Sequence, residues 1–404
     1  MELNENDNVR AALKTHHIDA LMGLFQAGAY SELIEKTNRL LADFPEHPLL
    51  YNVLGISKAR LELFDGAIKN YQQAIKYKPD YADAYNNLGN AFRNNGDLEA
   101  AAAHYEKALS ISPDSAEFHN NIGVYFQHKR NYNRAAECFR RAIALNPKYV
   151  NAYNSLGAVM VDLGNPEEAA ECYQKSMVID KHNADARHML NALKNMKNEP
   201  VPQQYIRDLF DTYAPNFDAD LIYKLNYKIP KELRSLLDQH IELHKFATAL
   251  DLGCGTGLMG VEIQGIAQNL IGVDLSQKML KAAAKKGIYS ELIESDIIEY
   301  LAGTDKKFDL FTAADVFIYL GHLKDLFRQI TRCANSGAIL LFSTEHLAGD
   351  GYELNQTGRF SHSTAYVEDI CEAIGAEILC HRHCQLRKDA RKSILGCLYV
   401  VRIR

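Results

Sequence analysis

The sequence lacks any long apolar segment and any start typical of a secreted protein. No run of 18 apolar residues occurs among its 404 residues, whereas a membrane-spanning helix needs about 20. The first residues, MELNEND, are acidic and polar, unlike the basic and then apolar start of a secretory signal. We therefore expect neither a membrane partner nor secretion.

The chain also has no excess of basic charge and no regular framework of cysteines. Residues 1–195 contain 21 basic and 24 acidic side chains, and the remaining residues contain 24 and 27, so each part has a net charge of −3. Nucleic-acid-binding domains usually present a basic surface, and we therefore expect no nucleic-acid partner. The eight cysteines are scattered along the chain. This fits a reducing compartment, so a cytoplasmic location is expected.

A metal site is not expected either. The only dense group of metal-ligating residue types is Cys380-His-Arg-His-Cys384. On a strand its cysteines would face one side of the sheet and its histidines the other, so four ligands could not converge.

The length predicts two domains, and the first half repeats with a period of 34 residues. A short sequence motif ending in Leu-Gly or Ile-Gly recurs four times, with glycines at 55, 89, 123 and 157. Alanines, aromatic residues and small residues follow at fixed offsets: Ala67, Ala101, Ala135, Ala169; Tyr71, Tyr105, Phe139, Tyr173; Ala74, Ala108, Ala142, Ser176. This pattern resembles the tetratricopeptide repeat (TPR), two antiparallel helices per unit.

The resemblance implies an all-α superhelical TPR array over residues 1–195. It comprises a degenerate first repeat over 14–47, repeats over 48–81, 82–115, 116–149 and 150–183, and a capping helix over 184–195. Glycine and alanine are expected where paired helices approach most closely.

Asparagines precede the repeated glycines on the inner helix of each unit. Three of them, Asn87, Asn121 and Asn154, are candidate substrate-binding residues, because an amide carries both a donor and an acceptor and can hold a peptide backbone. The array resembles that of O-linked N-acetylglucosamine transferase, where such a ladder holds an extended substrate. One interpretation of these asparagines is that a protein or peptide ligand binds in the concave groove. The other is a solvated polar groove without a ligand.

The second half is organised around Ala247–Gly257, ATALDLGCGTG, which reads as a strand entering a glycine loop. Gly253, Gly255 and Gly257 permit a sharp turn and a close approach of the backbone to a ligand. Asp274 ends the next apolar strand, where a carboxylate can accept both ribose hydroxyls. The stretch resembles motif I of class I S-adenosylmethionine-dependent methyltransferases, and Asp274 matches their ribose-binding acid.

This resemblance implies S-adenosyl-L-methionine as cofactor, S-adenosyl-L-homocysteine as product, and a set of contacts. The loop would contribute Asp251, Gly253, Cys254, Gly255, Thr256 and Gly257, and Leu275, Ser276 and Met279 would border the adenosine. Asp296 would accept from the adenine amino group beside Ile297, and Ala313 and Ala314 would lie beside the methyl group. Tyr205, Tyr213 and Phe217, from lid helices over 203–237, would cover the methionine half.

From Phe246 onward, strand and helix patterns alternate, which indicates a parallel sheet with its ligand crevice at the carboxyl ends of the strands. Two long strands near the end, Ala376–Leu386 and Ile394–Arg402, break the alternation. The whole resembles the Rossmann-like, seven-stranded class I methyltransferase domain, predicted here over 196–404, after a polar joint at 194–204.

Methyl transfer from a sulfonium is an in-line displacement that depends mostly on positioning. Asp315, Tyr319 and His362 are candidate catalytic residues, and Arg359 is a candidate partner for a substrate carboxylate. Residues 313–316 read Ala-Ala-Asp-Val, in place of the Asn/Asp-Pro-Pro-Tyr/Phe of methyltransferases that modify DNA adenine.

The whole chain resembles bacterial predicted methyltransferases that carry TPRs ahead of a class I domain. The expected function is methyl transfer to a nucleophile on a protein, a peptide or a carrier-protein-bound substrate recruited by the array. Two alternatives remain open: an adaptor that binds the cofactor without transfer, and a small-molecule methyltransferase that uses the repeats to oligomerise. Monomer and homodimer are both possible.

Overall fold

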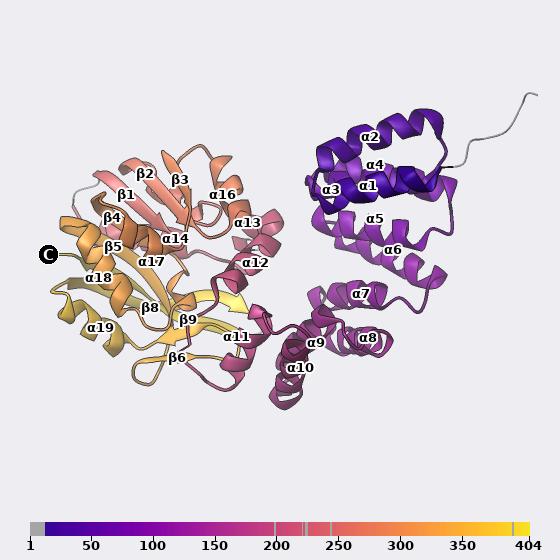
Figure 1. Ribbon diagram of the computed structural model, residues 1–404. Coiled ribbons are helices and arrows are strands. Elements are labelled where there is room, and N and C mark those ends of the chain that lie inside the picture. The colour runs from indigo at the N-terminus through magenta and orange to yellow at the C-terminus, as the bar shows by residue number, and fades with distance from the viewer. Residues whose placement is uncertain (1–12, 198, 220, 223–224, 243–244, 390–391) are drawn as a thin grey trace, which may run out of the picture. The chain divides into compact units, whose positions relative to one another are not determined.

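The computed structural model describes residues 13–197, 199–219, 221–222, 225–242, 245–389 and 392–404 (Figure 1). The chain forms two compact units, Met1–Asn165 and Pro166–Arg404. The division falls within the predicted fifth repeat, and the domain boundary expected after residue 195 stays a prediction.

The first unit consists of helices arranged as successive pairs. They are α1 (Thr15–Gln26), α2 (Tyr30–Asp43), α3 (Pro48–Arg60), α4 (Phe64–Tyr77), α5 (Ala82–Asn94), α6 (Leu98–Ile111), α7 (Ala116–His128), α8 (Tyr132–Leu145) and α9 (Val150–Asp162). The repeated glycines lie against the repeated aromatics: a Cβ on Gly89 would lie 2.6 Å from the ring of Tyr105, and one on Gly123 2.7 Å from Phe139. Only glycine allows this contact, so the steric explanation of the repeat is confirmed.

The second unit contains one mixed sheet. Its strands among the described residues are β1 (Phe246–Leu252), β2 (Ala267–Asp274), β3 (Glu291–Glu294), β4 (Phe308–Ala313), β5 (Ala334–His346), β6 (Tyr352–Leu354), β7 (Phe360–His362), β8 (Glu377–Asp389) and β9 (Lys392–Arg402). Strands β3, β2, β1, β4 and β5 are neighbours in that order and parallel, and β9 pairs antiparallel with both β5 and β8. The predicted seven-stranded arrangement is confirmed.

Two short strands were not predicted. β6 and β7 pair antiparallel with each other, and β7 pairs in parallel with the last two residues of β5, Glu345 and His346. Residues 390 and 391, between β8 and β9 in the sequence, lie outside the described residues.

Helices cover both faces of the sheet. The helices of the second unit among the described residues are α10 (Pro166–Ile179), α11 (Ala184–Leu193), α12 (Gln203–Tyr213), α13 (Phe217–Ala219), α14 (Ile229–His240), α15 (Leu258–Ile263), α16 (Gln277–Ala284), α17 (Ile297–Gly303), α18 (Lys324–Cys333) and α19 (Thr364–Ala373), with 3₁₀ turns at Ala214–Asn216 and Phe317–Tyr319. Successive strand residues point to opposite faces, and two apolar cores result. Leu250 and Phe311 belong to one core, and Ala249 and Leu310 to the other.

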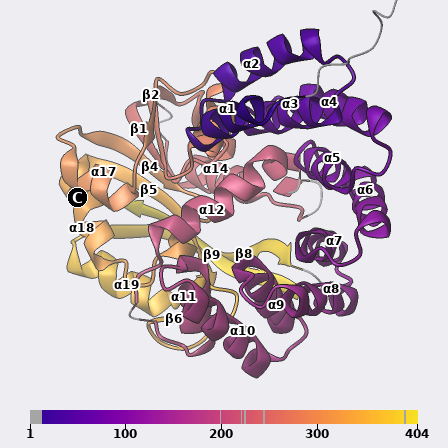
Figure 2. The ribbon, with the colours of Figure 1, turned by 45° about the vertical axis from the view of Figure 1, so that its right-hand side comes forward.

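Helix α11 packs beside the β6–β7 pair, as Figures 1 and 2 both show. Ala192 of α11 shares a small apolar cluster with Leu354 and Phe360, and Asn195 donates a hydrogen bond to Glu353 at 3.2 Å. Of the helices that the structure describes, none has the length and apolar character needed to cross a membrane.

Candidate functional site

A cavity of about 420 Å³ opens at the carboxyl ends of β1, β2 and β4. Its lining includes most of the residues that the sequence predicted for the cofactor: Asp251, Gly253, Cys254, Gly255, Thr256, Asp274, Leu275, Asp296, Ile297, Ala314, Tyr213 and Phe217. The predicted residues Asp315, Tyr319 and Arg359 line it as well. Parallel strands bring these segments to one edge of the sheet, which is where ligands bind in open α/β sheets.

The glycine turn has the backbone conformation that its sequence requires. Gly253, Gly255 and Gly257 have φ values of +62°, +54° and +88°, in the left-handed region that side chains disfavour. A Cβ on Gly253 would also lie 2.7 Å from Val316. The turn therefore depends on glycine for its conformation and for the space beside β4.

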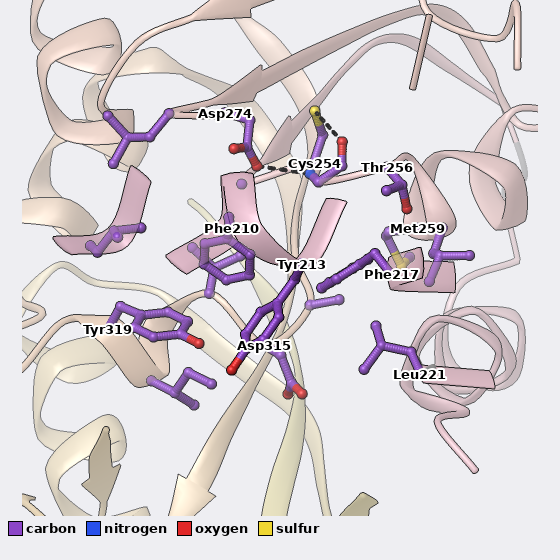
Figure 3. A pocket seen from close by; sticks show the side chains of 18 of the residues that line it. Phe210, Tyr213, Phe217, Leu221, Cys254, Thr256, Met259, Asp274, Asp315 and Tyr319 are labelled. Carbon is purple, nitrogen blue, oxygen red and sulfur yellow. Dashed lines mark hydrogen bonds between the residues drawn. The ribbon is translucent and has the colours of Figure 1, made fainter. Parts of the chain in front are cut away.

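Asp274 connects the end of β2 to this turn. Its carboxylate accepts a hydrogen bond from the backbone N–H of Gly255 at 2.8 Å (Figure 3) and another from the N–H of Ser276, also at 2.8 Å. Burial raises the pKa of Asp274 to about 6, and the nearby Asp211 carboxyl acts in the same direction. A carboxylate offers about four lone-pair positions, more than these two bonds use.

Asp251 lies deeper, at the end of β1. Its carboxylate accepts from the hydroxyls of Thr312, at 2.6 Å, and Tyr289, at 2.7 Å. Burial is the main cause that raises its pKa to about 6, against the effect of these two hydrogen bonds. Asp251 thus joins β1 to β4 below the glycine turn while remaining part of the cavity wall.

Asp296 and Ile297 lie at the start of α17. The carboxylate of Asp296 caps this helix by accepting from the N–H groups of Ile298, at 2.8 Å, and Glu299, at 3.1 Å. Capping by Asp is common at helix starts, so the helix alone accounts for an acid here. Both residues nevertheless line the cavity.

The segment 203–219, which we call the cover segment, closes one side of the cavity. Ile206, Phe210, Tyr213 and Phe217 all line it, and their spacing of four, three and four residues places them on one helical face. The rings of Phe210, Tyr213 and Phe217 lie between Asp274 and Asp315 in Figure 3. Ile206 and Phe210 were missed in the sequence, although this spacing was readable there.

Polar bonds fix the cover segment to the glycine turn. Asp218 accepts from the Thr256 hydroxyl and from Lys286 Nζ, the latter at 2.8 Å. Lys286 Nζ also donates to the Thr256 carbonyl at 2.6 Å, and the Ser276 hydroxyl donates to Asp211 at 2.5 Å. The segment is therefore attached to the glycine turn and to the loop that follows β2.

A charged group forms another part of the wall. Asp315 accepts from Arg387 at 2.8 Å and from the Ser343 hydroxyl at 3.0 Å, and Arg387 also pairs with Glu345. Asp315 has a φ of +58°, a strained conformation for a residue with a side chain, and the Ser343 hydroxyl holds it by accepting from its N–H at 2.8 Å. Arg387 was missed in the sequence, because pairing of β9 with both β5 and β8 brings it to the cavity.

Several predicted cofactor residues lie outside the cavity lining. Tyr205 packs against His188 in a tilted arrangement, with ring centroids 4.5 Å apart and 42° between the ring planes. Met279 is fully buried, and Ser276 caps α16 by accepting from the Met279 N–H. Ala313 is buried in the core of the sheet, and Gly257 serves as the N-cap of α15.

His362 is also outside the cavity, which corrects its expected role as a proton acceptor. The imidazole is fully buried, and its Nε2 hydrogen-bonds to the Gly321 carbonyl at 3.0 Å. Burial lowers the pKa of His362 to about 4. The ring stacks near Tyr366, with centroids 5.8 Å apart, so its surroundings explain it as part of the packing.

In the repeat unit the asparagine amides pair with one another between neighbouring repeats. Asn87 donates to Asn52 at 3.1 Å, and Asn121 donates to Asn86 at 2.8 Å. Asn86 in turn donates to Glu117 at 2.8 Å. The predicted ladder exists, but these amides bond to each other, and they join adjacent repeats. Asn154 lies on α9 and is half-buried.

Comparison with known proteins agrees with this architecture. Tetratricopeptide repeat families match residues 52–116 and 150–183, a TPR repeat family matches 130–164, and a methyltransferase domain family matches 250–342. The chain carries TPRs followed by a methyltransferase domain. In the part that the structure describes, we find no group of three or more His, Cys, Asp and Glu side chains placed to hold a metal ion.

Individual proteins are similar to one part of the chain each. A malonyl-[acyl-carrier protein] O-methyltransferase of Legionella pneumophila is 30% identical over 169 residues, 38% of this chain and 58% of that protein. The chain thus spans about three-fifths of the length of this curated relative. The N-methyltransferase NodS of Bradyrhizobium japonicum, solved with S-adenosyl-L-homocysteine, is 16% identical with a TM-score of 0.41, covering 49% of this chain and 97% of NodS. The TPR protein TTC0263 of Thermus thermophilus is 20% identical with a TM-score of 0.39, covering 44% and 97%.

Proposed function

We propose that this protein transfers the methyl group of S-adenosyl-L-methionine to a nucleophile held in the cavity. The observation that carries the proposal is the enclosure of the glycine turn, Asp274 and Asp296 in one cavity of about 420 Å³. This volume is in the range of about 300–1,000 Å³ typical of small-molecule sites. Bound there, the cofactor would supply an electrophilic methyl group on a sulfonium.

Different cavity residues would bind different parts of such a cofactor. The remaining lone pairs of Asp274 would accept the ribose hydroxyls, and Leu275 and Ile297 provide apolar surface for the adenine beside Asp296. Gly255 leaves space for the ligand next to the turn, since a Cβ there would meet only the Phe217 ring, at 3.9 Å. Phe210, Tyr213 and Phe217 of the cover segment would exclude water from the reacting groups.

The domain would promote the reaction mainly by placing the nucleophile in line with the methyl group. Displacement at a methyl group needs alignment more than proton transfer, and Ala314, Asp315 and Tyr319 are the parts of the wall that follow β4. We propose Asp315 and Tyr319 as residues that contact the acceptor. Asp315 is fixed for this purpose by Arg387 and Ser343.

We further propose that the TPR array recruits the molecule that carries the acceptor, either a protein or peptide or a small group on a carrier protein. TPRs present extended surfaces for protein ligands, and the relative from Legionella pneumophila is named for a carrier-bound substrate. Because Asn121 and Asn86 bond to each other, recruitment would use the surface around this ladder. The whole protein is expected in the cytoplasm.

The test is transfer of label from S-adenosyl-L-[methyl-³H]methionine to protein and small-molecule fractions of a cell lysate. The full-length protein should label at least one fraction and release S-adenosyl-L-homocysteine. Gly253→Ala should do neither, because the new Cβ would collide with Val316. Cofactor binding without transfer to any fraction would instead favour the adaptor function.

A further inference from the structure

Helix α11, predicted as the cap of the repeats, belongs to the second compact unit and is buried on two sides. Ala186 and Leu190 are buried, and so are His188 and Ala192, each two residues further along the helix. Residues two apart point to roughly opposite sides of an α-helix. A helix that only caps a repeat array needs one buried face and keeps a polar outer face. The second buried face of α11 therefore has another role.

The face that carries His188 lies against the β6–β7 pair. Ala192 shares an apolar cluster with Phe360 of β7. One turn earlier, His188 Nε2 forms a hydrogen bond of 2.8 Å with the carbonyl of Gly358. Since a carbonyl only accepts, Nε2 carries the proton. The helix thus reaches residues 355–359, which we call the β6–β7 loop, through a side-chain donor.

The imidazole of His188 also touches the cover segment. It is 1% exposed, and burial lowers its pKa, so the ring is neutral at neutral pH. The ring packs against that of Tyr205, and the next residue, Ile206, lines the cavity. His188 therefore lies between two segments that contribute to the cavity wall.

Glycine at position 358 allows the close approach of the loop to the helix. Gly358 has a φ of +77°, and a Cβ there would lie 3.1 Å from both His188 Nε2 and Met189 Sδ. Any other residue would be strained at this φ and would press on α11. The carbonyl can meet the imidazole at hydrogen-bond distance because position 358 has no side chain.

The β6–β7 loop has a second support on the side of the sheet. The backbone N–H of Asn355 donates to the Arg359 carbonyl at 2.9 Å, and the Gly358 N–H donates to the Asn355 carbonyl, also at 2.9 Å. The side chain of Asn355 donates to Glu345 at the end of β5, at 3.3 Å. The loop is therefore held by Glu345 on one side and by His188 on the other.

Arg359 connects this support to the cavity. It follows Gly358 directly, and it lines the cavity. Its side chain forms a hydrogen bond with Tyr319, which we propose above as a contact of the methyl acceptor. The connection from His188 to Tyr319 therefore consists of two hydrogen bonds and the backbone and side chain between them.

Resting on the proposed function, we infer that His188 is a positioning residue for methyl transfer, whose hydrogen bond to Gly358 holds Arg359 and, through it, Tyr319 in the wall that receives the acceptor. The cofactor side has contacts of its own, between Asp274 and the backbone of Gly255. Loss of the bond to Gly358 thus impairs use of the acceptor and leaves cofactor binding intact.

Variants of the full-length protein separate the hydrogen bond from the packing. His188→Phe keeps an aromatic ring beside Tyr205 but removes the donor, and His188→Leu is a second variant without a donor. His188→Gln places an amide N–H at about the distance of Nε2 along the side chain, so it can restore the bond. His182→Gln, at an exposed histidine just before α11, is the control.

The first measurement is amide hydrogen exchange without ligand. In His188→Phe and His188→Leu, we expect residues 355–361 to exchange faster by about 5- to 100-fold, the effect of a buried carbonyl left without its donor. Exchange in β1 and β4 should be unchanged, and His188→Gln and the control should be close to wild type. Wild-type exchange of the loop in both variants without a donor overturns the support by His188.

The second measurement is methyl transfer to a lysate fraction that the wild-type protein labels from S-adenosyl-L-[methyl-³H]methionine. At limiting amounts of this fraction, His188→Phe should transfer about 5- to 30-fold less label, and His188→Gln should recover most of the loss. Calorimetric affinity for S-adenosyl-L-homocysteine should be equal in all variants. Wild-type transfer by His188→Phe, or an equal loss in His188→Gln, overturns the positioning role. A matching loss of cofactor affinity overturns its assignment to the acceptor.

The outcomes also distinguish this inference from the proposed function. If the wild-type protein binds S-adenosyl-L-homocysteine but labels no fraction, the proposed function fails, and the role of His188 in transfer fails with it. The exchange measurement still decides whether His188 holds the loop. If the wild-type protein labels a fraction and His188→Phe labels it equally, only the inference fails.

Discussion

Replacing Asp251 with Asn should stabilise the methyltransferase domain at neutral pH. The carboxyl is 1% exposed, and its pKa of about 6 lies about two pH units above the ordinary 3.8. Ionising it in the folded domain therefore costs about 3 kcal/mol relative to the unfolded chain. Asparagine has the same shape without the charge. Its two partners, the hydroxyls of Thr312 and Tyr289, can each donate or accept, so both hydrogen bonds can be kept.

The sign of the pH dependence follows from the raised pKa. Between pH 4 and 6 the folded domain still binds this proton while the unfolded chain has released it, so the free energy of unfolding falls as pH rises. Asp274, also with a pKa of about 6, acts in the same direction. His362, whose pKa is lowered to about 4, acts in the opposite direction. The difference between wild type and Asp251→Asn isolates the contribution of Asp251.

The measurement is urea unfolding from pH 4.5 to 8, followed by far-ultraviolet circular dichroism because the chain has no tryptophan. Hydrogen exchange of peptides from β1 and β4 in urea identifies the transition of this domain. We expect Asp251→Asn to gain about 3 kcal/mol at pH 7.5 and only about 1 kcal/mol at pH 4.5. Asp325→Asn, an exposed control, should change by about 0.5 kcal/mol or less. A variant no more stable than wild type at pH 7.5, with a parallel pH profile, would refute the argument.

Three further predictions concern the cofactor side, the cover segment and the repeats. Affinity for S-adenosyl-L-homocysteine should weaken as pH falls below 6, because protonated Asp274 accepts hydrogen bonds poorly. An affinity that calorimetry finds unchanged between pH 8 and pH 5 would contradict this. Lys286→Met removes the ion pair with Asp218, so residues 203–219 should exchange amide hydrogens faster; unchanged exchange there would argue against the attachment. Asn121→Ala removes the donor to buried Asn86 and should destabilise the repeat unit by about 1–3 kcal/mol with cofactor affinity unaltered, which urea unfolding and calorimetry measure; equal stability would show that the ladder is not structural.

The parts of the fold that follow from local sequence were predictable. A 34-residue period and an apolar strand entering a glycine turn are short-range patterns, and they indicated the repeats and β1 with its loop. The β6–β7 pair was missed, since strands of three residues are too short to show an alternating pattern. The spacing of Ile206 and Phe210 relative to Tyr213 was present in the sequence, but the choice of Tyr205 followed residue type and not helical face.

The charged group of Asp315, Arg387 and Glu345 depends on long-range contacts. Arg387 and Asp315 are 72 residues apart in sequence, and only the antiparallel insertion of β9 between β5 and β8 brings them together. The asparagine ladder shows that a visible sequence pattern does not always reveal which contacts its residues make. Its period was visible, but whether the amides face a ligand or each other depends on the distance between stacked helices, which no single repeat encodes.

The central claim is that the glycine turn and Asp274 bind an adenosyl cofactor. Calorimetric titration of the full-length protein with S-adenosyl-L-homocysteine at pH 7.5 tests it most directly. We expect saturable binding at one site per chain, displaced by S-adenosyl-L-methionine and strongly weakened in Gly253→Ala. Absence of saturable heat with both compounds, from a folded protein, would contradict the claim.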